Sequence, residues 1–236
     1  MNYVFDLFGT LIDAKTDCES TMFWNKAQEI FRRFSVNLEP NTLKRLYTDG
    51  IKSRIINETD EPDFADVFAD IFIYSKTPYN PNIISSLAWE FRKESFLYAR
   101  LFNKEEETLC NLKKTGASMY ILSNAQEIFT IPLIKKLGLD AYFDGILLSS
   151  QCGVKKPDSR LFYHFLDMYE LDANECIYIG NNWDTDIIGA DSAGMKTVFF
   201  ALSNENKHPP IPLKTIVGVD YAELYSFLLT YNNYSR

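Results

Sequence analysis

The chain has 236 residues, of which 46% are hydrophobic and 15% aromatic, so it can bury a large core. Its net charge of -8 and pI near 4.9 argue against nucleic acid or an anionic membrane surface as a partner. Four widely separated cysteines and two histidines exclude a zinc finger and argue against a disulfide framework. With no targeting leader before the first strand and no apolar run near the roughly 18 residues of a membrane span, we expect a cytoplasmic protein.

The first predicted element is a short buried strand at residues 3–5, which ends in Asp6. Gly9 and Thr10 then turn the chain. Ligands of an open α/β sheet bind at the carboxyl ends of strands. A carboxylate there, beside a glycine that lets backbone N–H groups approach an anion, suits a nucleophile facing a phosphoryl or acyl centre. An ordinary strand end followed by an Asx turn is the structural alternative.

Residues 20–109 are predicted to form consecutive helices, joined to the first strand by a polar connector at residues 13–20 that we expect to act as a hinge. Ser20 or Thr21 is a candidate cap for the first helix. The apolar positions recur with helical spacing in four segments: Phe23, Ala27, Ile30, Phe31 and Phe34; Leu43, Leu46, Tyr47 and Ile51; Phe64, Val67, Phe68, Ile71 and Phe72; and Ile84, Leu87, Ala88, Phe91 and Phe96. These largely aromatic stripes indicate the interior of a helical bundle.

From about residue 108 onward, predicted strands alternate with helices. The strands lie at 117–122, 145–149, 176–179, 196–200 and 215–219, with helices at 160–169, from about 186, and at 221–229. This alternation predicts parallel crossovers and an α/β fold with a doubly wound parallel sheet. Because the helical segment follows the first strand, we expect it to form a cap over the carboxyl edge of the sheet. The predicted core domain therefore comprises residues 1–14 and 106–236, and the predicted cap residues 15–105.

Polar side chains follow four of these strands. They are Asp6, the pair Ser123-Asn124, the loop 153–158 with Lys155 and Lys156, and the segment 180–186 with Asn181 and Asp186. Each cluster alone has an ordinary structural reading as a cap, a solvated loop or a turn. The strand ends meet in one crevice, however, where they supply a carboxylate, a hydroxyl, an ammonium group and oxygen ligands for a hard cation.

The order of these motifs resembles the haloacid dehalogenase-like (HAD) hydrolase superfamily, in the branch with a helical cap after the first strand. The resemblance covers nearly the whole chain and rests on five segments: Asp-Leu-Phe-Gly-Thr-Leu at 6–11, Leu-Ser-Asn at 122–124, Lys-Lys-Pro-Asp-Ser-Arg-Leu-Phe at 155–162, Ile-Gly-Asn at 179–181 with Asp-Ile-Ile-Gly-Ala at 186–190, and Ala-Gly-Met at 193–195. It implies a Rossmann-like core. It is specific for the fold and much less so for the substrate.

The resemblance also implies roles for individual residues. Asp6 matches the nucleophile that forms a covalent aspartyl intermediate, Ser123 the hydroxyl that holds the transferring group, and Lys156, rather than Lys155, the lysine that orients the nucleophile. The implied Mg²⁺ ligands are Asp6, the backbone carbonyl of Phe8, Asn181 and Asp186, and the implied substrate-binding residues are Gly9, Thr10 and Asn124.

Two positions depart from the phosphatase pattern. Phe8 stands where family phosphatases carry an aspartate as general acid, whose loss costs ~100- to 10,000-fold for a poor leaving group. Family dehalogenases carry an aromatic there, and the Trp183-Asp184 pair also resembles them. Asn181 stands where phosphatases place a metal-binding aspartate, and an amide binds Mg²⁺ with less charge.

We therefore predict a Mg²⁺-dependent phosphatase that acts on a small phosphorylated metabolite. Either its substrate is a phosphate monoester or anhydride with a good leaving group, or the enzyme takes its acid from water or from the substrate. The first alternative is a metal-independent 2-haloacid dehalogenase, which needs a cap arginine, with Arg32, Arg33, Arg45 and Arg54 as candidates. The second is a binding or regulatory protein that kept the fold and lost strong turnover. A small-molecule partner is expected, and the sequence does not indicate the oligomeric state.

Overall fold

The computed structural model describes residues 1–203 and 209–234, which contain a six-stranded sheet in the order β5-β4-β1-β6-β7-β8 with every neighbouring pair parallel. The strands are β1 (Asn2–Phe5), β4 (Ser118–Ser123), β5 (Gly145–Leu148), β6 (Cys176–Gly180), β7 (Lys196–Ala201) and β8 (Lys214–Val217). The predicted α/β class with a doubly wound parallel sheet is thus confirmed. β1 lies at the centre, so Asp6 follows the most enclosed strand.

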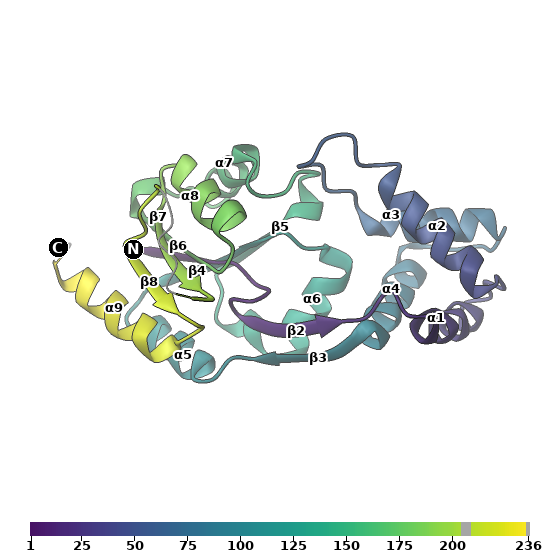
Figure 1. The fold of residues 1–236 in the computed structure, drawn as a ribbon, viewed down its shortest axis with the longest axis horizontal. Helices are drawn as coiled ribbons and strands as arrows, with labels where there is room; N and C mark the ends of the chain where they lie inside the picture. Colours follow the sequence, from purple (N-terminus) through teal and green to yellow (C-terminus); the bar gives the residue numbers. More distant parts are fainter. Residues whose placement is uncertain (204–208, 235–236) are drawn as a thin grey trace.

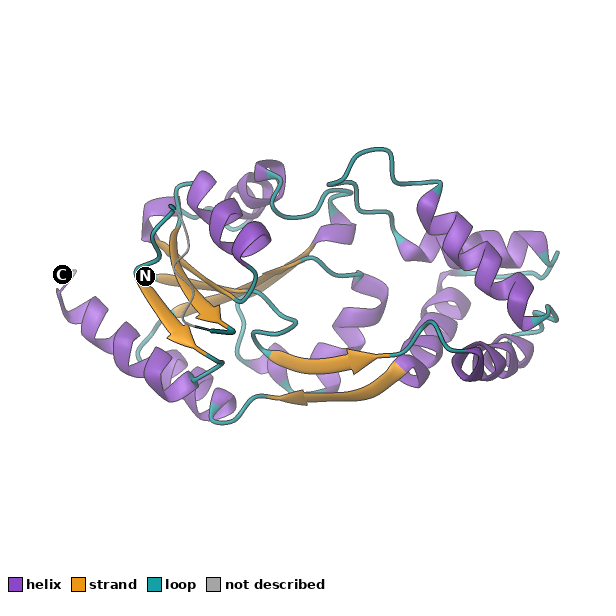
Figure 2. Ribbon diagram, viewed as in Figure 1, coloured by secondary structure: helices purple, strands orange, loops and turns teal. Residues whose placement is uncertain are grey.

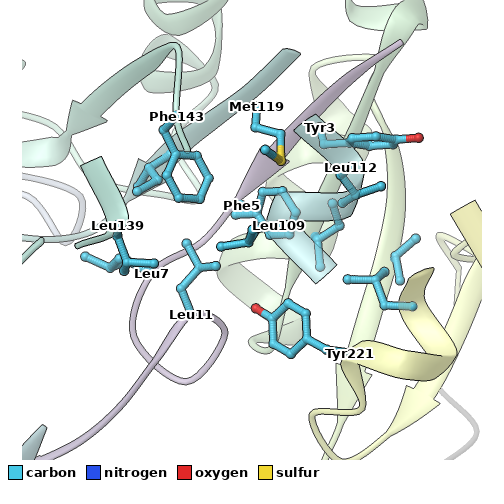
Figure 3. Close-up of a cluster of buried hydrophobic side chains, with 14 of the residues drawn as sticks. Tyr3, Phe5, Leu7, Leu11, Leu109, Leu112, Met119, Leu139, Phe143 and Tyr221 are labelled. Carbon is cyan, nitrogen blue, oxygen red and sulfur yellow. The ribbon is translucent and has the colours of Figure 1, made fainter. Parts of the chain in front are cut away.

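Helices cover both faces of this sheet (Figure 1). They are α5 (Glu105–Lys114), α6 (Glu127–Lys136), α7 (Ser159–Met168), α8 (Ile188–Ser192) and α9 (Tyr221–Tyr234), with short helical turns at Leu139–Ala141, Ser149–Gln151, Ala173–Glu175 and Trp183–Ile187. Tyr3 and Phe5 lie in one buried cluster with residues of α5 and α9 (Figure 3) and of α6, whereas Val4 packs against α7 and α8 on the opposite face. The three consecutive residues 3–5 of β1 are therefore all buried, as the continuous apolar run predicts.

A second core lies in the helices α1 (Thr21–Arg33), α2 (Pro40–Lys52), α3 (Phe64–Tyr74) and α4 (Pro81–Ser95), which we call the helical unit. The unit stands at the end of the molecule away from the N-terminus (Figure 1). Ser20 caps α1 by accepting a hydrogen bond from the Phe23 N–H. Phe23, Phe68 and Phe91 form edge-to-face ring contacts in its interior, and Phe129 of α6 joins them from the sheet side.

A two-stranded antiparallel ribbon of β2 (Ile12–Thr16) and β3 (Phe96–Leu101) connects the sheet to the helical unit (Figure 2). The predicted polar connector after Asp13 and the predicted place of Phe96 on the fourth helix are both wrong, because residues 13–16 belong to β2 and Phe96 belongs to β3. The two strands pair across about 80 residues of sequence, and neither has the clean alternation that marks a half-buried strand.

The division into a core of residues 1–14 and 106–236 and a cap of residues 15–105 stays a prediction, and its core range includes seven residues, 204–208 and 235–236, outside the described part. In the described part of the chain, no helix combines the length and the apolar character needed to cross a bilayer.

Glu105 is a buried carboxyl at the start of α5. One of its oxygens accepts a hydrogen bond from the Phe102 N–H at 2.9 Å, while the other has no hydrogen-bond partner among the described residues. Burial raises the pKa of Glu105 from 4.5 to about 8. The folded protein therefore holds a proton on this group at pH values where the unfolded chain has released it.

The free energy of unfolding is consequently expected to fall as the pH rises from about 4.5 to about 8, because the folded state binds more protons in this window. Glu105→Gln keeps the hydrogen bond from Phe102 and removes the ionisation, so the variant should be more stable than the wild type at pH 8 by about 2–5 kcal/mol. Urea unfolding at pH 5 and pH 8 measures this difference. Glu107→Gln, two residues along on the exposed surface, is the control. An equal pH dependence in all three proteins would contradict the assignment.

Candidate active site

Asp6, Ser123 and Lys156 meet at the carboxyl edge of the sheet, as their positions after strands predict. Asp6 follows β1, and its N–H continues the ladder by donating to the Ile179 carbonyl of β6 at 2.9 Å. Ser123 is the last residue of β4, the neighbour of β1 on the other side. Lys156 reaches the same point from the loop before α7. Residues 150 positions apart in the sequence are thereby brought into hydrogen-bond contact.

One oxygen of the Asp6 carboxylate is held by two donors. Its Oδ1 accepts hydrogen bonds from Ser123 Oγ at 2.9 Å and from Lys156 Nζ at 2.7 Å. Within the described part of the chain, no donor contacts Oδ2. The Asp6 side chain is 9% exposed, compared with 1% for Lys156, so Asp6 is the more accessible partner. The arrangement fixes the carboxylate and leaves one oxygen available to attack.

Lys156 also binds a second buried carboxylate and a tyrosine. Nζ donates to Asp186 Oδ1 at 2.6 Å and to the Tyr178 hydroxyl at 2.6 Å, and that hydroxyl donates to the Leu122 carbonyl at 2.7 Å. Together with Asp6 and the Leu122 carbonyl at 3.3 Å, these acceptors satisfy all three N–H groups of the ammonium. Tyr178 was not among the residues predicted from the sequence. The available signal was a tyrosine in the middle of the otherwise apolar strand β6.

The charges of this cluster shift its pKa values. Burial alone would lower the pKa of Lys156, but the carboxylates of Asp186 and Asp6 raise it, so the lysine stays protonated. Burial raises the pKa of Asp6, and repulsion from Asp186 adds to this, while Lys156 acts in the opposite direction. The ammonium group of Lys156 thus forms ion pairs with two buried carboxyl groups.

Asn124, a predicted substrate-binding residue, lies next to this cluster and binds the lysine loop. Its Oδ1 accepts a hydrogen bond from the Lys156 N–H at 2.7 Å, and its Nδ2 donates to the Lys156 carbonyl at 3.0 Å. The paired contacts fix the backbone from which the lysine side chain extends.

Gly9 and Thr10 hold Asn181 against the loop that follows Asp6. Gly9 has φ +81°, and a Cβ on it would lie 2.4 Å from Asn181 Nδ2, so only glycine fits there. Thr10 Oγ1 lies 3.2 Å from Asn181 Oδ1 and donates to it. Asp186 holds the same segment through its Oδ2, which accepts hydrogen bonds from the N–H groups of Asn181 and Asn182 at 3.1 and 2.9 Å.

The predicted metal ligands provide oxygen donors with little negative charge. Three of them, the Asp6 carboxylate, the Phe8 carbonyl and the Asn181 amide, come from the two segments that Gly9 allows to approach each other. Both oxygens of the fourth, Asp186, already accept hydrogen bonds from the protein. No group of three or more His, Cys, Asp or Glu side chains within residues 1–203 and 209–234 could hold a metal. The donor set suits a hard cation such as Mg²⁺, held with less charge than a carboxylate cluster would give.

A cleft of about 210 Å³ opens beside Phe8 and Asn124 and extends to the helical unit. Its lining residues are Phe8, Tyr47, Glu61, Phe64, Arg92, Asn124, Ala125, Gln126, Phe129 and Thr130.

Arg92 of α4 is the arginine that lines this cleft. Of the four arginines considered from the sequence, Arg32, Arg33 and Arg45 are exposed and Arg54 pairs with Asp70 at 2.7 Å. Arg92 was not predicted, because helical periodicity does not show which polar position of α4 points toward the sheet.

Residues 3–200 match a protein family described as haloacid dehalogenase-like hydrolase. A glyceraldehyde 3-phosphate phosphatase of Pyrococcus abyssi is 31% identical over 123 residues, which cover 52% of each chain. The homologous protein of the same name from Pyrococcus furiosus is 33% identical over 122 residues, covering 52% of this chain and 51% of the relative. The chain thus matches about half the length of these curated relatives.

Solved structures share the fold over nearly the whole chain. A 2-haloacid dehalogenase of Pseudomonas syringae pv. Tomato superimposes with a TM-score of 0.63 at 19% identity, covering 97% of this chain and 98% of that one. Identity at this level shows the fold alone.

Removal of the Tyr178 hydroxyl tests the lysine cluster. Tyr178→Phe removes the 2.6 Å hydrogen bond from Lys156 and the 2.7 Å hydrogen bond to the Leu122 carbonyl, and leaves only the longer 3.3 Å contact between Lys156 Nζ and that carbonyl, so it should destabilise the protein by about 1–3 kcal/mol in urea unfolding. The matched control is Tyr120→Phe, on the neighbouring strand β4, whose hydroxyl has no hydrogen bond recorded in the described structure. Equal stability of the two variants would show that the tyrosine contributes packing only.

Proposed function

The chain belongs to the haloacid dehalogenase-like hydrolase family, and we propose that it is a phosphatase that uses Asp6 as its nucleophile on a small phosphorylated metabolite. One observation carries the proposal: the carboxylate of Asp6 is fixed through Oδ1 by Ser123 and Lys156, while Oδ2 is free of donors from the described residues. The names of the curated relatives, which are phosphatases of a small metabolite, support the choice of a phosphate ester.

In the proposed reaction Asp6 Oδ2 attacks the phosphorus atom, and the bond from phosphorus to the leaving oxygen breaks. Water then attacks the phosphorus of the resulting aspartyl phosphate, which releases inorganic phosphate and restores the carboxylate. Ser123 and Lys156 hold the carboxylate in one orientation, and the protonated lysine lowers the cost of the negative charge that collects around phosphorus. Asp186 and Tyr178 position the lysine.

We propose Mg²⁺ as the cofactor. Its ligands would be Asp6, the Phe8 carbonyl and Asn181, together with Asp186, the fourth ligand predicted from the sequence. When bound, the ion supplies charge neutralisation and orientation for the phosphoryl group. The amide of Asn181 gives it one negative charge fewer than an aspartate would, so we expect weaker Mg²⁺ binding than at a site with an aspartate there. The helical unit is proposed to act as the cap that covers this edge.

A second candidate, 2-haloacid dehalogenase, is favoured by Phe8. An aromatic ring cannot protonate a leaving group, and a halide needs no protonation. In this reaction Asp6 would displace halide from carbon, and water would hydrolyse the resulting ester. The two candidates differ in their need for Mg²⁺.

The first test is hydrolysis of p-nitrophenyl phosphate by the wild type and by Asp6→Asn, with Mg²⁺ and with EDTA. We expect activity that needs Mg²⁺ and falls at least about 1,000-fold in Asp6→Asn, because the nucleophile is lost. Asp13→Asn, which makes the same change at a surface ion pair with Arg100, should stay within about twofold of the wild type. Chloroacetate turnover that is unaffected by EDTA would instead establish the dehalogenase.

The second test concerns the missing acid at Phe8. The wild type should hydrolyse p-nitrophenyl phosphate far faster than an alkyl phosphate, because only the former leaves without a proton. Phe8→Asp is expected to narrow the ratio of the two kcat/KM values by about 10-fold or more, since a positioned acid contributes roughly 100- to 10,000-fold. Phe8→Leu, which changes the side chain without adding an acid, is the control. A similar ratio in all three proteins would show that the acid comes from elsewhere.

A further inference from the structure

The cleft beside Phe8 contains a cation that the proposed mechanism does not use. Arg92 of α4 lines it, and the Nε of its guanidinium group is buried with no hydrogen-bond partner in the described structure. The guanidinium carbon lies 4.9 Å from the ring centre of Phe96 and 5.4 Å from that of Phe129. These rings hold the group in place by cation–π contact and leave its N–H groups without a charged acceptor.

Among the described residues, no carboxylate forms an ion pair with Arg92. The acidic groups that act on it are Cys18 and Tyr47, and burial raises the pKa of both, so both are neutral at pH 7. Glu61 lines the same cleft but accepts a hydrogen bond from Gln126, and the cation that acts on it is Lys155. The positive charge of Arg92 is therefore uncompensated.

Arg92 is half-buried, and burial of part of a charged group without a partner is costly for a folded protein. Burial lowers the pKa of Arg92, but a guanidinium group titrates so far above neutral pH that it keeps its charge in such a site. The cost is recovered when a ligand supplies the missing anion, and the aromatic rings of the lining lower the local dielectric and strengthen that contact. Asp6 and Ser123 do not themselves line the cleft, but Phe8 and Asn124, two and one residues after them in the chain, do. A substrate whose phosphoryl group lies at Asp6 would therefore place its leaving part in this cleft, toward Arg92.

We propose that Arg92 binds a second anionic group on the leaving part of the substrate, either a carboxylate or another phosphate. The inference rests on the proposed phosphatase function and narrows its substrates to small phosphate monoesters that carry a further negative charge. A planar guanidinium group makes paired hydrogen bonds to either anion. The volume of about 210 Å³ suits a leaving group of a few carbon atoms.

The test compares three ligands with the same two-carbon skeleton: phosphoglycolate, ethylene glycol bisphosphate and 2-hydroxyethyl phosphate. Dissociation constants are measured by titration calorimetry with Mg²⁺ present, in the full chain carrying Asp6→Asn so that no ester is turned over. At least one of the two anionic ligands should bind about 10- to 100-fold more tightly than the neutral alcohol, as expected for charge-assisted hydrogen bonds in a buried site. Comparison of the carboxylate with the bisphosphate identifies which anion the site prefers.

Arg92→Met, added to the same background, should reduce this preference to about one. Arg92→Lys should retain part of it, because an ammonium group keeps the charge and loses the paired geometry. Arg33→Met is the matched control: it removes an exposed arginine of the helical unit that pairs with Glu90 at 3.5 Å, and it should leave the preference unchanged.

A purely structural role for Arg92 predicts a different result. In that case the anionic and neutral ligands bind equally in the Asp6→Asn background, or the preference survives in Arg92→Met, and either result overturns the inference. The melting temperature of Arg92→Met is expected to stay within about 3 °C of its parent, since the charge it removes has no partner. If Arg92→Met does not fold, Arg92→Lys decides, and an unchanged preference in it contradicts the inference. Wild-type inactivity toward p-nitrophenyl phosphate would refute the phosphatase while leaving this binding result intact.

Discussion

The site depends on one buried ammonium group shared by two buried carboxyl groups. Asp6 and Asp186 would repel each other in a low-dielectric interior, and Lys156 offsets this by donating to both at 2.7 and 2.6 Å. The three groups come from the end of β1, the turn after β6 and the loop before α7, so the geometry exists only when the sheet has its observed strand order. Tyr178 completes the coordination of the lysine from within β6. The strand order of the sheet therefore determines which side chains meet in the site.

Phe8 and Asn181 both make the surroundings of this cluster less negative than an aspartate at the same position would. An aspartate at each position would place two more negative charges beside Asp6, where the proposed reaction would place an anionic phosphoryl group. Phe8 and Asn181 remove that repulsion, and they also remove the general acid and weaken the attraction for a cation. The amide of Asn181 still fits the close approach that Gly9 permits, and the hydrogen bond from Thr10 fixes its oxygen. In the proposed phosphatase, these two residues would make the site less negative at the cost of weaker metal binding and a missing acid catalyst.

The sequence predicts those features that local patterns determine. The alternation of apolar strands and helices gives the parallel sheet, and polar residues at strand ends identify Asp6, Ser123 and Lys156 as neighbours, because parallel strands end at one edge. The ribbon of β2 and β3 was missed because its strands pair across the whole helical unit. Tyr178 and Arg92 were not predicted because the role of each depends on the direction in which its side chain points. The periodicity of a buried strand or of an amphipathic helix does not give that direction.

The position of Arg92 follows from how the helical unit is attached to the sheet. α4 ends at Ser95 and β3 begins at Phe96, so the arginine lies one turn before the chain enters the ribbon that leads back to the sheet. Phe96 of that ribbon and Phe129 of α6 flank the guanidinium group, one from each side of the junction. These two rings lie where the helical unit meets the sheet. They therefore also fix the position of the Arg92 guanidinium group, whose charge has no carboxylate partner among the described residues. A substrate anion at this junction would contact both parts of the molecule and so would couple binding in the cleft to the packing of the helical unit against the carboxyl edge of the sheet.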